Sequence, residues 1–91
     1  MDTLDELRHA IADLDLALLK LLSRRQAIIS MIASQKKTLS CPIFDSDQEQ
    51  KQHEQYQNWA NELALSPLWV EKFFQVIIAY SKETQKTIRA E

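Results

Sequence analysis

The sequence predicts an all-α protein, and three observations support this fold class. The 91 residues include no glycine, although the tight turns of a sheet usually need glycine for a positive φ angle. Leucine and isoleucine recur every three or four residues from Leu4 to Leu21, as on one face of a helix. The two prolines, Pro42 and Pro67, divide the chain into three segments. The length suits one small domain, residues 1–91.

The first helix is expected from about Thr3 to about Lys37. Thr3 is a suitable N-cap, and Glu6 three residues later completes a capping box. A helix of about 35 residues spans roughly 50 Å, whereas a compact domain of this size has a diameter of roughly 30 Å. A monomer would therefore expose the leucine stripe, whose heptad-like spacing suits a partner helix. We expect a homodimer in which two copies of this helix pack together.

The second helix is expected after the loop Leu39–Phe44. Ser46 followed by Glu49 is typical of a capping box, so Ser46 is the expected N-cap. The helix should continue to about Glu62. Its first half is almost wholly polar, which leaves few anchors for packing.

The third helix is expected from Ser66-Pro67, a cap residue followed by proline at the first helical position. It should run to the neighbourhood of Ile88. Its apolar face, continued along the helix, meets Ser81 and then Gln85. Either polar residue is compatible with the edge of a core or with a binding site.

Composition and charge exclude several classes of function. The formal net charge is −2, with acids and bases interspersed, which argues against a nucleic-acid partner. No apolar run approaches the roughly 18 residues that cross a bilayer, and the acidic N-terminus lacks the apolar region of a signal peptide. Cys41 has no cysteine or histidine companion at metal-site spacing. We expect a cytoplasmic protein that uses neither a metal nor a cofactor and does not bind membranes.

Two cations interrupt the apolar stripe of the first helix. Arg25 occupies a position of the stripe, and Lys36 lies near the same line 11 residues later. They share a face about 16 Å apart along the axis, and burial of either cation without a partner is costly. An anionic ligand between them would resolve this cost. The sequence alone favours a Lys36 side chain that extends to water, and it leaves both interpretations of Arg25 open.

The acids have a structural interpretation as well. The capping box alone explains Glu49, and the helix macrodipole favours Asp45 at a helix start. With Arg25, Lys36, Ser81 and Gln85 they would form a polar pocket with two cations, two acids, a hydroxyl and an amide. No nucleophile is evident among them.

A resemblance to a known family implies that these residues form one binding site. The run LDELRHAIADLDLALLKLLSRR, then Lys36, then Asp45 to Glu49, then IIAYSKETQ, resembles the all-helical (AroQ-class) chorismate mutases over nearly the whole chain. The resemblance implies an intertwined homodimer of three-helix chains whose long first helix spans both active sites. It implies the rearrangement of chorismate to prephenate in phenylalanine and tyrosine synthesis. That reaction is a one-step pericyclic shift, which needs no nucleophile.

The resemblance also implies individual roles. Arg25 and the partner subunit's Arg8 would hold the two carboxylates of the substrate. Lys36 and Gln85 would donate hydrogen bonds to the ether oxygen as negative charge develops on it. Catalysis would then consist of holding the reactive conformer and stabilising this charge.

The remaining roles include one departure from the family pattern. Asp45 and Glu49 would hold the ring hydroxyl, and Ser81 would support a carboxylate. Gln48 stands where the family usually has a carboxylate-binding arginine, so this position lacks its positive charge. The loss corresponds to roughly 10- to 100-fold in catalytic efficiency. Lys51, one turn away, is a candidate to replace the missing charge.

Two alternatives stay open at this level. One is a relative that acts on isochorismate or on an amino analogue of chorismate. The isochorismate lyases of this fold keep the arginine and lose both acids, which is the reverse of the pattern here. The other alternative is a helical dimerisation module whose pocket has decayed, which the retention of the other pocket residues argues against.

Overall fold

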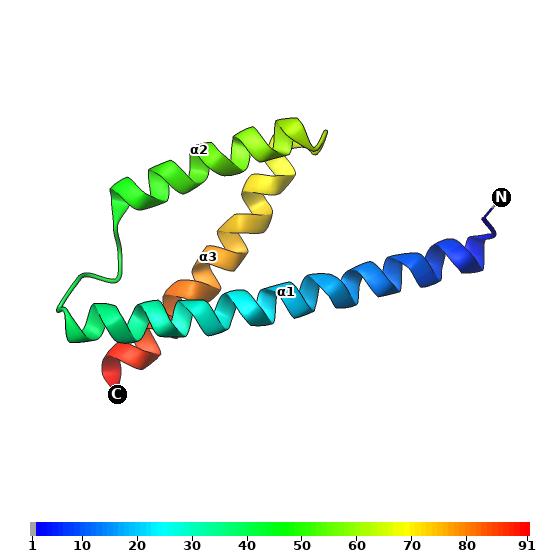
Figure 1. The fold of residues 1–91 in the computed structure, drawn as a ribbon. Helices are drawn as coiled ribbons and strands as arrows, with labels where there is room; N and C mark the ends of the chain where they lie inside the picture. The colour runs from blue at the N-terminus through cyan, green and yellow to red at the C-terminus, as the bar shows by residue number, and fades with distance from the viewer. Residues whose placement is uncertain (1) are drawn as a thin grey trace.

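The computed structural model describes residues 2–91 as three helices joined by short loops (Figure 1). Helix α1 spans Leu4–Thr38, α2 spans Ser46–Glu62 and α3 spans Pro67–Ala90. The described residues contain no strand, and the prediction of an all-α fold is confirmed. None of the three helices combines the length and the apolar character that a membrane crossing requires.

Two of the three predicted helix starts are confirmed. The Thr3 hydroxyl accepts a hydrogen bond from the backbone N–H of Glu6 at 3.2 Å and donates one to Glu6 Oε1 at 3.0 Å. The Ser66 hydroxyl accepts from the backbone N–H of Trp69 at 3.4 Å, and Pro67 follows in the first turn. Each cap satisfies an N–H group that has no partner inside the helix.

The predicted cap of α2 is wrong. Asp45, rather than Ser46, is the N-cap, and its carboxylate accepts from the backbone N–H of Gln48 at 3.1 Å. Both residue types are good caps, but a carboxylate also interacts favourably with the positive end of the helix dipole. Ser46 is consequently the first residue of the helix, and the capping box that was expected to occupy Glu49 does not form.

Helices α1 and α2 end in the same way although the chain has no glycine. Ser40 and Ala64 adopt left-handed backbone conformations, with φ of 57° and 56°. After each turn a backbone N–H returns to the last helical turn, from Cys41 to the Lys36 carbonyl at 2.8 Å and from Leu65 to the Ala60 carbonyl at 2.9 Å. These bonds form Schellman motifs, which stop both helices and turn the chain toward the helix that follows each of them.

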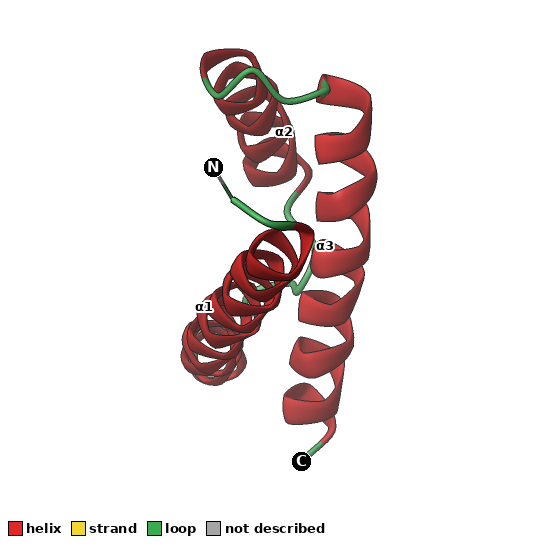
Figure 2. Cartoon of the chain, turned by 90° about the vertical axis from the view of Figure 1, so that its right-hand side faces the viewer, coloured by secondary structure: helices red, strands yellow, loops and turns green. Residues whose placement is uncertain are grey.

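Helix α3 connects the other two. Figure 2, which looks nearly along α1, shows α1 and α2 on the same side of α3. Only the C-terminal half of α1 packs against α3, and its N-terminal half extends alone (Figure 1). The rings of Tyr56 and Phe74 stack with centroids 3.7 Å apart and join α2 to α3. The amide of Gln26 donates to the Thr84 hydroxyl at 2.9 Å and joins α1 to α3.

The chain is elongated and has little interior of its own. It measures 56 × 26 × 15 Å and has a radius of gyration of 16.6 Å, against about 12 Å for a compact domain of this length. Four of the described residues are buried, namely Ala33, Ala60, Ser81 and Gln85. Two of these four, Ser81 and Gln85, are polar, and both line the polar pocket described below.

Candidate functional site

A pocket of about 300 Å³ lies between the C-terminal half of α1, the loop that follows it, the start of α2 and the C-terminal half of α3. Its walls combine four isoleucines with charged and amide side chains. The lining residues are Arg25, Ile29, Ile32, Lys36, Ile43, Asp45, Gln48, Glu49, Gln52, Ile78, Ser81, Lys82 and Gln85. Every predicted site residue except Arg8 is among them.

Arg25 is directed toward α3 and not toward water. Its guanidinium donates to the Ser81 hydroxyl, which in turn donates to the Ile77 carbonyl at 2.9 Å. Ser81 is buried, with 4% of its surface exposed. Among the described residues no carboxylate lies within ion-pair distance of Arg25. The arginine is therefore held in position by a neutral partner, and its charge is available to an anion.

Lys36 is held inside the pocket, so the interpretation that it extends to water is wrong. Its ammonium donates to the Ile43 carbonyl at 3.0 Å and to Gln85 Oε1 at 3.1 Å. The Schellman turn after α1 folds the loop back over Lys36 and brings the Ile43 carbonyl within reach. An ammonium only donates, so Gln85 presents its amide oxygen to Lys36 and keeps its Nε2 hydrogens for another acceptor.

The two acids come from the first turns of α2. Asp45 caps the helix while its carboxylate lines the pocket. One turn later, Glu49 Oε1 lies 2.8 Å from the ammonium of Lys82 on α3. Gln48 lines the same wall and is exposed. Glu49 therefore serves an interhelical ion pair and not a capping box, because Asp45 has taken the cap.

Sequence reasoning missed Lys82 and Gln52, which also line the pocket. For Lys82 a signal was present: it lies four residues after Ile78 and three before Gln85, on one face of α3. Lys51, the suggested replacement for the missing arginine, is exposed and is not part of the pocket wall.

Arg8 lies outside the pocket of its own chain. It is on the projecting half of α1, where its side chain is 71% exposed and its guanidinium is 3.9 Å from the carboxylate of Asp5. Arg25 is 17 residues further along the same helix, or roughly 25 Å. Within one chain, Arg8 and Arg25 therefore cannot bind the same small molecule.

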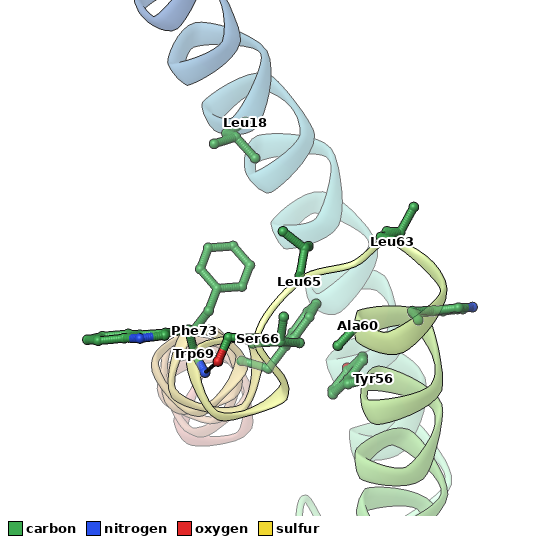
Figure 3. Close-up of a pocket in the computed structure, with 11 residues that line it drawn as sticks. Leu18, Tyr56, Ala60, Leu63, Leu65, Ser66, Trp69 and Phe73 are labelled. Carbon is green, nitrogen blue, oxygen red and sulfur yellow. Dashed lines mark hydrogen bonds between the residues drawn. The ribbon is translucent and has the colours of Figure 1, made fainter.

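The chain also has two apolar pockets, one of which shares Arg25 with the polar pocket. The first, of about 440 Å³, lies between α2 and α3 with Leu18 of α1 at its edge. Figure 3 shows Tyr56 and Ala60 on α2, and Trp69 and Phe73 on α3 with the Trp69 ring directed away from α2. The second, of about 700 Å³, extends along α1 and α3 and includes Arg25 in its lining. Arg25 thus separates a polar pocket from an open apolar surface.

Comparison with known proteins gives one consistent result. The family model described as chorismate mutase type II matches residues 7–86, a range that includes every predicted site residue. A curated chorismate mutase from Methanocaldococcus jannaschii is 28% identical over 86 residues, which cover 94% of this chain and 87% of that protein.

Proposed function

The chain belongs to the chorismate mutase type II family, and we propose that it rearranges chorismate to prephenate in the polar pocket described above. Family membership makes it an isomerase, a chorismate mutase. One observation supports the choice of pocket above all others: Lys36 and Gln85, the expected donors to the ether oxygen, are in contact there, with Arg25 and Ser81 beside them. Neither comparison favours an isochorismate enzyme, an amino-chorismate enzyme or a non-enzymatic module.

The reaction needs a site that positions the substrate in its reactive conformer and stabilises the charge that develops in the transition state. It breaks the ether C–O bond and forms a C–C bond in one step, with no proton transfer. A binding site accelerates such a step by holding the reactive conformer and by placing hydrogen-bond donors where charge develops. The absence of a nucleophile from the pocket wall is compatible with this chemistry.

We assign carboxylate binding to Arg25. A guanidinium matches a carboxylate with two parallel N–H donors, and a single such charge-assisted bond is stronger than a neutral one. Its bond to the buried Ser81 hydroxyl fixes the direction of the side chain before substrate arrives. The side-chain entropy lost on binding is accordingly small.

We assign stabilisation of the ether oxygen to Lys36 and Gln85. The ammonium has two protein acceptors and three hydrogens, which leaves one donor for the substrate. The Gln85 amide, oriented by Lys36, offers its Nε2 hydrogens beside it. Two donors that converge on one oxygen stabilise the charge that appears there as the bond breaks.

We assign the ring hydroxyl to the acids of α2. Carboxylates accept hydrogen bonds from a hydroxyl, and Asp45 and Glu49 lie one turn apart on the wall that faces α1 and α3. Because Asp45 is fixed by the Gln48 backbone and Glu49 by Lys82, both acceptors are preorganised.

We further propose that two copies form an intertwined dimer. The single chain exposes 7320 Å², whereas a folded monomer of this mass exposes about 5,500 Å². The excess surface is apolar: the six leucines from Leu4 to Leu19 on α1, and Trp59, Trp69 and Phe73 of the apolar pockets, are more than 45% exposed. A partner's α1 packed on these surfaces would bury them and bring the partner's Arg8 toward the second apolar pocket, whose lining includes Arg25.

We further propose that this activity serves phenylalanine and tyrosine synthesis, as the resemblance implies, and that it takes place in the cytoplasm, as the composition predicts. The experiment that tests the function is incubation of the purified protein with chorismate, followed by ¹H NMR of the products. Prephenate formed faster than in buffer supports the assignment. A folded dimer that leaves chorismate unchanged would overturn it.

A further inference from the structure

We propose that Lys82 binds a carboxylate of the substrate and supplies the positive charge that Gln48 lacks. This inference rests on the proposed function and adds a residue to it. Lys82 extends from α3 into the pocket wall, where its ammonium lies 2.8 Å from Glu49 Oε1. Gln48 is the neighbour of Glu49 on α2 and lines the same pocket. The ammonium is therefore on the wall where an arginine at position 48 would place its charge.

The charge balance of the pocket requires a further cation. Without Lys82, the two cations Arg25 and Lys36 face the two acids Asp45 and Glu49, and the pocket has no net charge toward a dianion. With Lys82, the chain contributes one net positive charge. The partner's Arg8 would raise this to two, which equals the charge of a dicarboxylate and favours its entry.

The Lys82 side chain has hydrogen-bond donors left for a ligand. An ammonium has three N–H donors, and Glu49 occupies one of them. The Lys82 ammonium also lies 4.7 Å from the centre of the ring of Phe44, the residue between Ile43 and Asp45 of the pocket wall, in a cation–π contact. With 34% of its side chain exposed, Lys82 has room to turn toward an incoming carboxylate without breaking a buried network.

A second role would explain the same contact. Lys82 could act through Glu49 alone, by orienting that carboxylate, and a partly exposed ion pair of this kind contributes little to stability. The two roles differ in one respect. An arginine at position 48 could replace the contact between Lys82 and a carboxylate of the substrate. It could not replace the ion pair by which Lys82 on α3 orients Glu49.

The test is a double-mutant cycle on the intact protein. Lys82→Met keeps the aliphatic stem and removes the charge, and we expect it to raise KM for chorismate roughly 10- to 100-fold with a smaller change in kcat. In the Lys82→Met background, Gln48→Arg should return KM to within about threefold of wild type. In the wild-type background the same Gln48→Arg change should have a smaller effect, because the wall already holds a cation.

Matched controls make the outcome specific. Lys86→Met removes an exposed lysine one turn further along α3, outside the pocket wall, and should leave KM unchanged. Circular dichroism and sedimentation verify that each variant keeps its helices and assembly. An unchanged KM in Lys82→Met overturns the proposal, and so does a raised KM that Gln48→Arg fails to restore.

The proposed function can fail separately. If the wild-type protein forms no prephenate, calorimetric titration of chorismate into wild type and Lys82→Met decides the inference alone. Weaker binding by the variant supports a carboxylate contact at Lys82. Equal binding, or no binding by either protein, overturns it.

Discussion

The two cations of this pocket, Lys36 and Arg25, are held in position by hydrogen bonds to neighbouring groups. Lys36 is held between a backbone carbonyl of the following loop and the amide of Gln85, and Arg25 is held by a buried hydroxyl. In both cases the partner is neutral. A neutral partner fixes a cation without cancelling its charge, which is the property that a site for an anion needs.

The prediction at the residue scale concerns Lys36. Lys36→Met removes one donor to the ether oxygen and should lower kcat about 100- to 1,000-fold, as the loss of a single preorganised donor does in other enzymes. Lys37→Met, which removes the adjacent exposed lysine, is the matched control and should retain full activity. Initial rates of chorismate disappearance at saturating substrate measure both. A kcat for Lys36→Met within threefold of wild type would remove Lys36 from the mechanism.

Much of the pocket was predictable from residue pattern, and the failures have physical causes. Arg25 stood out because a cation interrupts an apolar stripe. The position of Lys36 depends on a carbonyl seven residues later, in a loop whose path the sequence pattern does not define. Glu49 was assigned to a capping box because Ser46 is an acceptable cap, and only the folded chain shows that Asp45 takes this role. Lys82 was overlooked because its partner comes from another helix.

At the scale of the elements, the helix ends determine where the pocket forms. The fold class, three helices and nearly all of their boundaries follow from leucine spacing, caps and prolines. The loop between α1 and α2 is different, since its return toward α1 depends on a left-handed residue that is not glycine. Residues with a Cβ atom, such as serine and alanine, disfavour the left-handed backbone conformation. Their presence in the sequence therefore does not predict a turn of this kind.

The element-scale prediction uses this strain. Ala64 has φ of 56°, a conformation that costs a residue with a Cβ atom roughly 1 kcal/mol more than glycine. Ala64→Gly should therefore raise the free energy of unfolding by about 0.5 to 1 kcal/mol, measured by urea denaturation. Ala79→Gly, the same change at an exposed position inside α3, should lower it by about 1 kcal/mol. A destabilised Ala64→Gly variant would contradict this account of the turn.

At the scale of the whole molecule, a single chain leaves a large apolar surface exposed. The N-terminal half of its longest helix projects away from the other two helices (Figure 1), and two of its pockets are apolar and open, including the largest. The proposed second copy would cover this leucine face and would also account for the distance between Arg8 and the pocket of its own chain. The projection of α1 follows from its length in the sequence, because no compact domain of 91 residues accommodates such a helix; the dimer stays a prediction.

A substitution in the leucine stripe tests the assembly. Leu14 is 60% exposed in the single chain, and Leu14→Glu would place a charge in the proposed dimer seam. We expect the variant to sediment as a monomer or to lose its helices, and to lose activity in either case. Lys20→Glu alters the opposite, polar side of the same helix, which also carries His9, Asp13 and Arg24, and this variant should remain a dimer. A Leu14→Glu protein that stays dimeric and active would exclude the stripe from the interface.

The most direct test of the central claim, a mutase pocket completed by a second copy, is complementation between two inactive chains. Arg8→Ala and Lys36→Met are prepared separately, then unfolded and refolded together in equal amounts. In a mixed dimer, the pocket of the Arg8→Ala chain keeps its own Lys36 and receives the partner's Arg8. The account predicts that the mixture regains about a quarter of the wild-type rate of prephenate formation, since half of the dimers are mixed and each has one intact pocket. A mixture no more active than its two components would contradict it.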